Sequence, residues 1–458
     1  MMRRLLITFG LALTLVALNG GAAGSRDSRR TSPVPTTKAI LTASVTSSGT
    51  RYLRGEPAVD NGVPSYIFGT NDTMDYGSPN VDTLPSVQAD LKAGGLTLMR
   101  VWSYYGDTKA YVLSKVKAAQ NAGMTCMFML GATDNLAWLE KTLGWVAPYC
   151  HIFEFGNEPD NYNSPAGAKI STYTSQWLAD IPVLRALDPG ALFGGPTIMW
   201  SSSTDGSQGS YASDMAYFLA KTAAANERAD FIDYHDYPCT KATSEAQCLS
   251  MTPGDFLWNW NQVIGWENQY YGAVIPTGVS EYNFDPGTGN LYAWCKDGTF
   301  MSAWTQSALE EIVALHMAFA NQFDSLNWGG YGCYDMFSDA APYGPKPQFT
   351  ALVSEVQKYT SLSTQVLVPS NGASLKGKAV LDASAAGTRT ITGVRFVLSG
   401  GSLPTRVVVG TAVGTLYGWV AQWNTTSVAN GTYNLQSVAT EAGGTTATSP
   451  KITVKVSN

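Results

Sequence analysis

The sequence has 458 residues, of which 45% are hydrophobic and only 14% are charged. This length accommodates one large domain and a smaller second one, each with its own apolar core. The formal net charge is −6 and no run of Lys or Arg follows the N-terminus. We therefore expect no binding to nucleic acid, which depends on clustered basic groups.

The N-terminus has the pattern of an export signal. Arg3 and Arg4 precede an apolar stretch at 5–18, and small residues follow at 20–24. The competing interpretation is a membrane anchor, but the apolar stretch is short for a membrane span. We predict a signal peptide over 1–24, a disordered leader rich in Ser, Thr and Arg over 25–45, and a secreted, extracellular protein that is not held in the membrane.

Short apolar runs alternate with amphipathic, helix-like stretches from about residue 65 to 360. The predicted strands are 65–71, 96–103, 125–132, 151–158, 192–197, 231–237, 275–283 and 325–331. Eight strands alternating with helices at this rhythm predict an α/β fold, a closed parallel (β/α)8 TIM barrel over 46–362. The alternative is a doubly wound open sheet, but the first predicted strand is followed by no Gly-rich phosphate-binding turn.

The composition changes near Ser361. Residues 363–458 are rich in Val, Thr, Ser, Gly and Ala, and alternating runs such as YNLQSVAT and KITVKV are bounded by turn residues. This pattern predicts a β-sandwich of about seven short strands. The stretch WNTTSVANGTYNLQSVATEAGG resembles bacterial immunoglobulin-like modules. We expect a stabilising spacer domain. The alternative is a carbohydrate-binding module that uses Trp419 and Trp423 as stacking surfaces.

The cysteines fit an oxidising compartment, and their positions suggest three pairs. These are Cys126 with Cys150, Cys239 with Cys248, and Cys295 with Cys333. The sequence leaves this pairing open. Neither a CxxC motif nor a Cys/His cluster has the spacing of a zinc site, so we expect no structural zinc.

The strongest chemical signal is FGNEPDN at 155–161, at the end of the fourth predicted strand. Enzymes with this fold place catalytic groups at the carboxyl-terminal rim of the barrel strands. Cleavage of a glycosidic bond needs two carboxyl groups, and the second candidate, Glu281, ends the seventh predicted strand. Strands four and seven lie on opposite sides of the barrel mouth, so the carboxyl groups of Glu158 and Glu281 can converge.

Asn157-Glu158-Pro159 after strand four and Glu281 after strand seven resemble the retaining glycoside hydrolases of clan A, which includes families 5, 39 and 79. The resemblance covers residues 65–360. It implies that Glu158 is the general acid/base and Glu281 the nucleophile, and that Asn157 binds the sugar 2-hydroxyl.

Four further positions match the clan. The resemblance implies that Arg100 orients the nucleophile, that Tyr237 of the His235-x-Tyr237 pair hydrogen-bonds the nucleophile, and that Trp328 is a sugar platform. The LGATDN segment after strand three lacks the His that family 5 carries in that region. The resemblance is therefore to the clan and leaves the family open, with a family 39-like member as the alternative.

Other residues at the predicted rim are candidates for supporting roles. Asn71 and Trp102 are candidate substrate contacts, and we expect Glu154 to be a buried structural acid paired with Arg100. The aromatic residues near predicted strand ends favour a sugar-binding cleft, since flat rings stack on pyranose faces. They are Trp102, Tyr104, Tyr105, Trp200, Tyr282, Trp294, Trp328 and Tyr331.

A metal site around His235 is a weaker alternative. Asp233 and Asp236 flank this histidine, but their spacing matches no established ligand motif, so we predict no catalytic metal and no cofactor.

The sequence thus predicts a secreted retaining glycosidase that acts by double displacement on β-linked sugars of a poly- or oligosaccharide. Arg100 is expected to keep Glu281 ionised, and the charge of Glu281 to favour the protonated form of Glu158. The alternatives are a lectin-like barrel that binds carbohydrate without catalysis and a transglycosylase that uses the same site. We expect no obligate protein partner.

Overall fold

The computed structural model describes residues 52–54, 56, 63–72, 80–132, 134–160, 169–285, 291–326, 334–387, 391–415 and 418–458. The predicted signal peptide and leader lie outside the described residues. Trp328, Tyr331 and Cys333 lie outside them as well.

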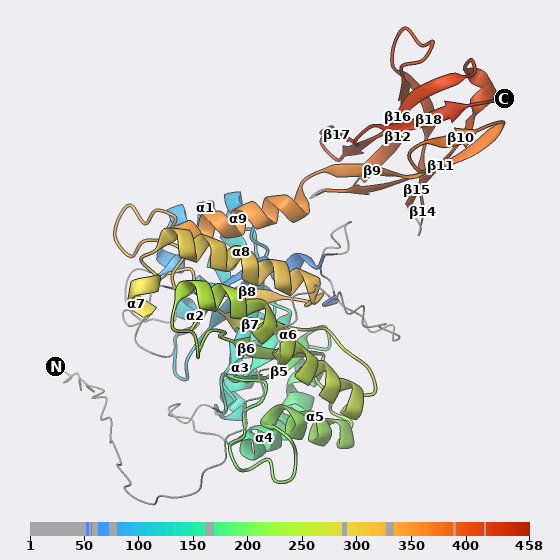
Figure 1. Ribbon diagram of the computed structural model, residues 1–458. Helices are drawn as coiled ribbons and strands as arrows, with labels where there is room; N and C mark the ends of the chain where they lie inside the picture. Colours follow the sequence, from blue (N-terminus) through green and yellow to red (C-terminus); the bar gives the residue numbers. More distant parts are fainter. Residues whose placement is uncertain are drawn as a thin grey trace, which may run out of the picture. The chain divides into compact units, whose positions relative to one another are not determined.

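Eight parallel strands in the described residues close into a barrel in the order β1 to β8, with helices between consecutive strands (Figure 1). The strands are β1 (Gly69–Asn71), β2 (Leu98–Trp102), β3 (Thr125–Leu130), β4 (Ile152–Phe155), β5 (Leu192–Ile198), β6 (Phe231–Asp236), β7 (Thr277–Tyr282) and β8 (Ala320–Gln322). This arrangement confirms the predicted (β/α)8 fold.

Helices α1–α9 follow the amphipathic stretches of the sequence. They are α1 (Pro85–Gly94), α2 (Lys109–Asn121), α3 (Leu136–Val146), α4 (Ile170–Leu187), α5 (Asp214–Ala224), α6 (Glu245–Tyr270), α7 (Leu291–Trp294), α8 (Gly298–Ala314) and α9 (Pro347–Thr360). Several begin at a side chain that accepts a hydrogen bond from a free backbone N–H of the first turn, as Ser244 does for α6 and Asp297 for α8.

The predicted strand bounds differ from the observed ones by a few residues at most positions, and for two strands the difference is larger. Residues Ser65–Ile67 form a 3-10 turn, and β1 begins only at Gly69. The eighth strand was predicted at 325–331, but β8 lies at Ala320–Gln322, within a stretch that the apolar pattern made look helical. Helix α8 ends at Ala314, and His316 has a left-handed φ of 57°, a conformation that stops a helix. The eighth strand therefore begins earlier in the sequence than the hydrophobic pattern predicts.

The barrel interior is apolar at one end and polar at the other. Side chains near the amino ends of the strands, such as Leu98, Ile152 and Phe231, form a buried apolar cluster. Two residues further along their strands, toward the carboxyl ends, the next inward-facing side chains are those of Arg100 and Glu154, which are fully buried. The apolar layer excludes water from below, so the polar groups can be approached only from the carboxyl-terminal rim.

Residues from Ser363 onward form two β-sheets, one with the strand order β10-β18-β16-β12-β13 and the other β14-β15-β11-β9. The described strands are β9 (Ser363–Val368), β10 (Ala373–Leu375), β11 (Lys378–Ala386), β12 (Ile391–Ser399), β13 (Val407–Thr411), β14 (Val413–Thr415), β15 (Gly418–Asn424), β16 (Gly431–Glu441), β17 (Thr446–Thr448) and β18 (Ile452–Val456). The predicted number of about seven was too low because β10, β14 and β17 have only three residues each.

The sandwich core explains the two tryptophans of this region. Trp423 is 2% exposed and lies among buried residues such as Phe396 and Leu435, so it is a core residue and offers no stacking surface. Trp419 is half-buried and packs against the same core.

Two disulfide bonds in the described residues have the expected partners, Cys126 with Cys150 and Cys239 with Cys248. Cys295 is also disulfide-bonded, whereas its expected partner Cys333 lies outside the described residues.

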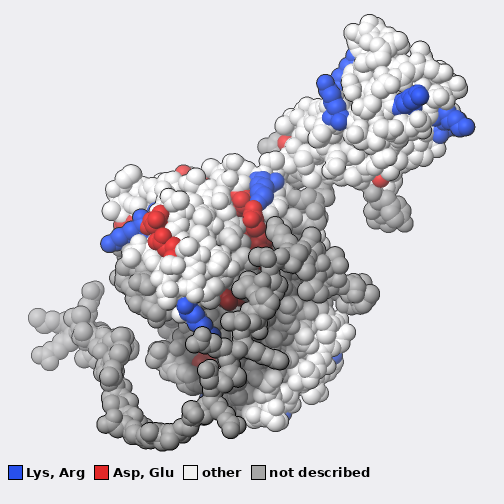
Figure 2. All heavy atoms as spheres, viewed as in Figure 1, with Lys and Arg blue, Asp and Glu red and all other residues white. Residues whose placement is uncertain are grey.

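Among the described helices, none combines the length and apolar character needed to cross a membrane. On the face shown in Figure 2, charged side chains are scattered among uncharged ones.

Candidate active site

The two candidate carboxylates meet at the barrel mouth. Glu281 lies on β7, and Glu158 lies three residues beyond the end of β4. Carboxylate oxygens of these residues and a ring nitrogen of His235 all lie within 4.8 Å of one another. The Nδ1 atom of His235 lies 2.9 Å from Glu158 Oε1 and 3.4 Å from Glu281 Oε2. Residues far apart in sequence thus converge because all strands of a parallel barrel end at one rim.

Both oxygens of Glu281 are held by donors. Arg100 Nη1 donates to Oε1 at 2.5 Å, and the hydroxyl of Tyr237 donates to Oε2 at 2.7 Å. Glu281 is 5% exposed. Charge-assisted hydrogen bonds from both sides stabilise a carboxylate and fix its orientation. This is the arrangement that the sequence resemblance implied for Arg100 and Tyr237.

Arg100 also binds Glu154 and Asn157. Its Nε atom donates to Glu154 Oε2, which confirms the predicted buried pair, and Nη2 donates to Asn157 Oδ1 at 2.7 Å. Burial alone would raise the pKa of Glu154, but the charge of Arg100 and nearby hydrogen bonds outweigh it, and the pKa lies below its ordinary value. One guanidinium therefore organises three of the side chains around the mouth.

Sequence reasoning missed the support of the Glu158 backbone. Glu158 N–H donates to the carbonyl of Thr197 at 2.8 Å. Both residues have left-handed backbones, with φ of 43° for Glu158 and 53° for Thr197, a conformation that disfavours β-branched residues such as Thr. Asp233 holds Thr197 there by accepting from its N–H at 3.1 Å and its hydroxyl at 3.0 Å. No motif in the sequence marks Thr197 for this task.

Asp233 and His235 both titrate away from their ordinary values. Burial raises the pKa of Asp233 well above its usual range, and the neighbouring charge of Glu154 adds to this effect. Burial lowers the pKa of His235, but the charge of Glu281 and the hydrogen bond with Glu158 outweigh burial, and the net shift is upward. A protonated His235 would balance part of the negative charge between the two carboxylates.

The remaining candidate contacts have different environments. Asn71 is buried, and its amide donates to the carbonyl of Ser280, the residue before Glu281, at 3.1 Å. Trp102 is 1% exposed, and its ring lies 5.5 Å from the Arg100 guanidinium carbon. Its role in substrate contact stays a prediction, as does that of Trp328.

The predicted group of rim aromatic residues is partly wrong. Tyr282 is buried against Phe256 and Trp304, on the outer side of the barrel. Trp294 is buried against Phe284 and belongs to the core. By contrast, Trp200 is half-buried, and Tyr105 is 63% exposed. Tyr104 is also exposed. Tyr282 follows Glu281 directly, and adjacent residues of a strand point to opposite faces.

A metal site is a second interpretation of the two carboxylates and the histidine. Among the described residues, the only group of three with the geometry for a metal ion is Glu158, His235 and Glu281. However, both oxygens of Glu281 already accept hydrogen bonds, one of them from a guanidinium that would repel a cation. Asp233 and Asp236 are not part of this group: Asp233 accepts hydrogen bonds from Thr197, and Asp236 accepts from Asn259 of α6.

Comparison with solved structures found chains that are similar to this one over most of its length. A monomeric β-xylosidase from Caulobacter crescentus CB15 is similar over 76% of this chain and 85% of its own, with 12% identity and a TM-score of 0.50. The barrel has the fold of a known glycoside hydrolase. An endo-β-1,4-mannanase from Thermotoga petrophila is similar over 88% of this chain and 100% of its own, with 14% identity and a TM-score of 0.43.

The sequence comparisons identify the C-terminal region. Residues 363–436 match the bacterial Ig domain family, which confirms the predicted immunoglobulin-like module. No curated protein matches the chain in sequence.

Proposed function

We propose that this protein is a retaining glycoside hydrolase that cleaves β-glycosidic bonds of a poly- or oligosaccharide by double displacement. The observation that carries the proposal is the approach of the Glu158 and Glu281 carboxylate oxygens to within 4.8 Å. Retaining enzymes hold the two carboxyl groups about 5–5.5 Å apart, whereas inverting enzymes need about 6.5–9.5 Å to admit a water molecule. An approach this close leaves too little room for the water molecule of an inverting enzyme and supports the retaining reaction.

The first step breaks the glycosidic bond. Glu158 donates its proton to the glycosidic oxygen, and a Glu281 oxygen attacks the anomeric carbon. The leaving alcohol takes the electron pair of the broken C–O bond, and Glu281 becomes a glycosyl ester. Glu158 is the less buried of the two acids, so its carboxyl group can reach the oxygen of the leaving group.

The second step releases the sugar. Glu158, now ionised, accepts a proton from water while the water oxygen attacks the anomeric carbon, and Glu281 leaves as a carboxylate. Arg100 and Tyr237 stabilise this carboxylate on both of its oxygens. Asn157, whose Oδ1 accepts from Arg100, keeps its amide NH2 for the sugar 2-hydroxyl.

We infer that the protein acts outside the cell. The export signal pattern over 1–24, the disulfide bonds and the bacterial Ig domain support this inference.

The decisive experiment is the stereochemical course of hydrolysis. Proton NMR of the products during the first minutes of reaction with an aryl β-glycoside should show the β anomer, with Glu281→Gln as the inactive control. An initial α anomer would overturn the retaining mechanism. Binding of glycans without any hydrolysis would favour a lectin-like barrel, and transfer to added sugar acceptors in place of hydrolysis would favour a transglycosylase.

A further inference from the structure

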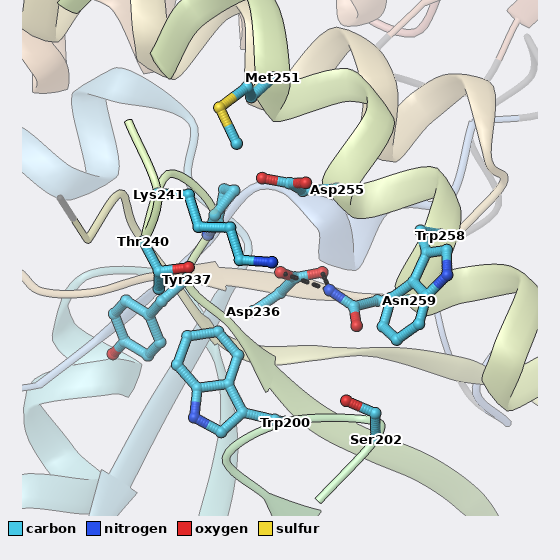
Figure 3. Close-up of a pocket in the computed structure, with 11 residues that line it drawn as sticks. Trp200, Ser202, Asp236, Tyr237, Thr240, Lys241, Met251, Asp255, Trp258 and Asn259 are labelled. Carbon is cyan, nitrogen blue, oxygen red and sulfur yellow. Dashed lines mark hydrogen bonds between the residues drawn. The ribbon is translucent and has the colours of Figure 1, made fainter. Parts of the chain in front are cut away.

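A pocket opens beside the catalytic centre, between the end of β6 and helix α6 (Figure 3). Its volume is about 340 Å³, within the range of about 300–1,000 Å³ that small-molecule sites occupy. Its lining comes from three segments: the loop after β5, the last residue of β6 with the loop that follows it, and α6. None of its residues entered the mechanism above except Tyr237.

The floor of the pocket is preorganised by buried hydrogen bonds. Asn259 of α6 donates from Nδ2 to both carboxyl oxygens of Asp236, at 3.0 and 3.1 Å. The hydroxyl of Ser201 donates to Asn259 Oδ1 at 2.5 Å. All three side chains are buried, and they join the three segments that line the pocket. A site with such a floor needs little reorganisation when it binds a ligand.

The walls combine aromatic rings with hydrogen-bonding groups. Trp200 and Trp258 line two sides of the pocket, and Lys241 and Asp255 lie on a further side, above both tryptophans in the view of Figure 3. Trp258 is 51% exposed, an unusual state for so large an apolar ring. The backbone N–H of Cys239 donates to Asp255 at 3.3 Å, so the disulfide-closed loop that carries Lys241 is attached to α6.

The pocket is connected to the catalytic centre through two contacts. Tyr237 lines the pocket, and its hydroxyl donates to Glu281 Oε2 at 2.7 Å. Met199, the neighbour of Trp200, donates its N–H at 2.8 Å to Asp160, two residues after Glu158. A group in this pocket would thus lie one side chain away from the nucleophile.

We propose that this pocket is a subsite for one uncharged pyranose ring of the substrate chain, beyond the ring that is cleaved. The proposal rests on the glycosidase function proposed above. Indole rings stack on the apolar face of a pyranose, while a carboxylate and an ammonium group hydrogen-bond its hydroxyls. The lining holds one basic side chain, Lys241, and two acidic ones, Asp236 and Asp255, so it carries no excess of positive charge that would attract a carboxylate. Such a lining favours an uncharged ring over a uronic acid.

The test measures binding without turnover. Isothermal titration calorimetry would use the Glu281→Gln protein and β-1,4-linked oligosaccharides of glucose, xylose and mannose, from disaccharide to hexasaccharide. Adding Trp258→Ala should weaken binding of the longer oligosaccharides about tenfold, the usual size of losing a buried aromatic contact. Leu257→Ala is the matched control, since Leu257 neighbours Trp258 on α6, is 44% exposed and does not line the pocket.

A kinetic measurement accompanies the binding test. The quantity measured is kcat/KM for the longest oligosaccharide divided by kcat/KM for an aryl glycoside, in protein that retains Glu281. Trp258→Ala should lower this ratio about tenfold, and Leu257→Ala should leave it unchanged. Equal affinities with and without Trp258 would overturn the proposal, and so would tighter binding of an oligosaccharide that carries glucuronic acid. Binding that depends on Trp258 in a protein that hydrolyses nothing would uphold the subsite and refute only the glycosidase.

Discussion

Arg100 donates to the Oε1 atom of Glu281 at 2.5 Å, and its own side chain has no exposure to solvent. Solvent does not screen this pair, so its geometry fixes the orientation of the proposed nucleophile. Because the same guanidinium also binds Glu154, catalysis and stability should depend on one residue.

Replacing Arg100 should therefore damage both properties. Arg100→Met leaves Glu154 and Glu281 buried without their cation, and breaking a buried ion pair costs about 3–5 kcal/mol. Urea unfolding should show this loss, and kcat should fall below detection. Arg185→Met is the control, because Arg185 pairs with Glu227 and Asp230 at partly exposed positions, and its loss should cost about 1 kcal/mol or less. A stable, active Arg100→Met protein would contradict the proposed role.

The two glutamates should be separable by the leaving group. Glu158→Ala should lower kcat on unactivated glycans by about 10²–10⁴-fold, but it should spare the first step with dinitrophenyl glycosides, whose leaving group needs no proton. Glu281→Ala should be inactive on both substrates, and added azide should not rescue retention of configuration. If the leaving group had no influence on the Glu158→Ala protein, Glu158 would not be the acid.

The hydroxyl of Tyr237 should act mainly on kcat. Tyr237→Phe removes the donor to Glu281 Oε2 and should lower kcat about 10²-fold, as expected for the loss of one hydrogen bond to a reacting group. The control is Tyr282→Phe, whose hydroxyl has no hydrogen-bond partner among the described residues and which packs outside the barrel. Steady-state kinetics on one aryl glycoside would compare the two, and equal rates would refute the role of Tyr237.

Removal of metal ions should leave the activity unchanged. Both oxygens of Glu281 accept hydrogen bonds, so the cluster with Glu158 and His235 offers a cation few free electron pairs beside the positive charge of Arg100. Dialysis against EDTA followed by assay in metal-free buffer should give the original kcat/KM. Loss of activity that returns on adding a divalent cation would support a metal-dependent hydrolase.

Stability should decrease from weakly acidic to alkaline pH, in part because of Glu267. Burial raises the pKa of Glu267 from 4.5 to about 8 in the folded protein. A raised folded-state pKa stabilises the protein fully below the unfolded value, and this stabilisation is lost as the pH rises through the folded value. Glu267→Gln should therefore equal the unmodified protein in urea unfolding near pH ~4, and exceed it by several kcal/mol near pH ~9. Identical pH profiles would contradict this prediction.

The barrel architecture and the approach of Glu158 to Glu281 could be predicted from the sequence. Alternation of apolar runs with amphipathic stretches predicts the barrel, because a parallel strand must bury both faces and a surface helix only one. Once the strands are counted, the ends of β4 and β7 bring Glu158 and Glu281 to one rim. The pairing of Arg100 with Glu154 could be predicted too, since neither charge is stable alone in a barrel interior.

The contacts that depend on strand register and helix rotation could be identified only in the folded structure. The support of Glu158 by Thr197 and Asp233 requires the irregular register between β5 and β6, which no pattern in either strand reveals. Likewise, Trp258 joins Trp200 only because of the way α6 is rotated against the barrel. Hydrophobic periodicity reports which face of an element is buried. It carries no information about which side chain of a neighbouring element lies opposite, because that follows from packing between segments distant in sequence.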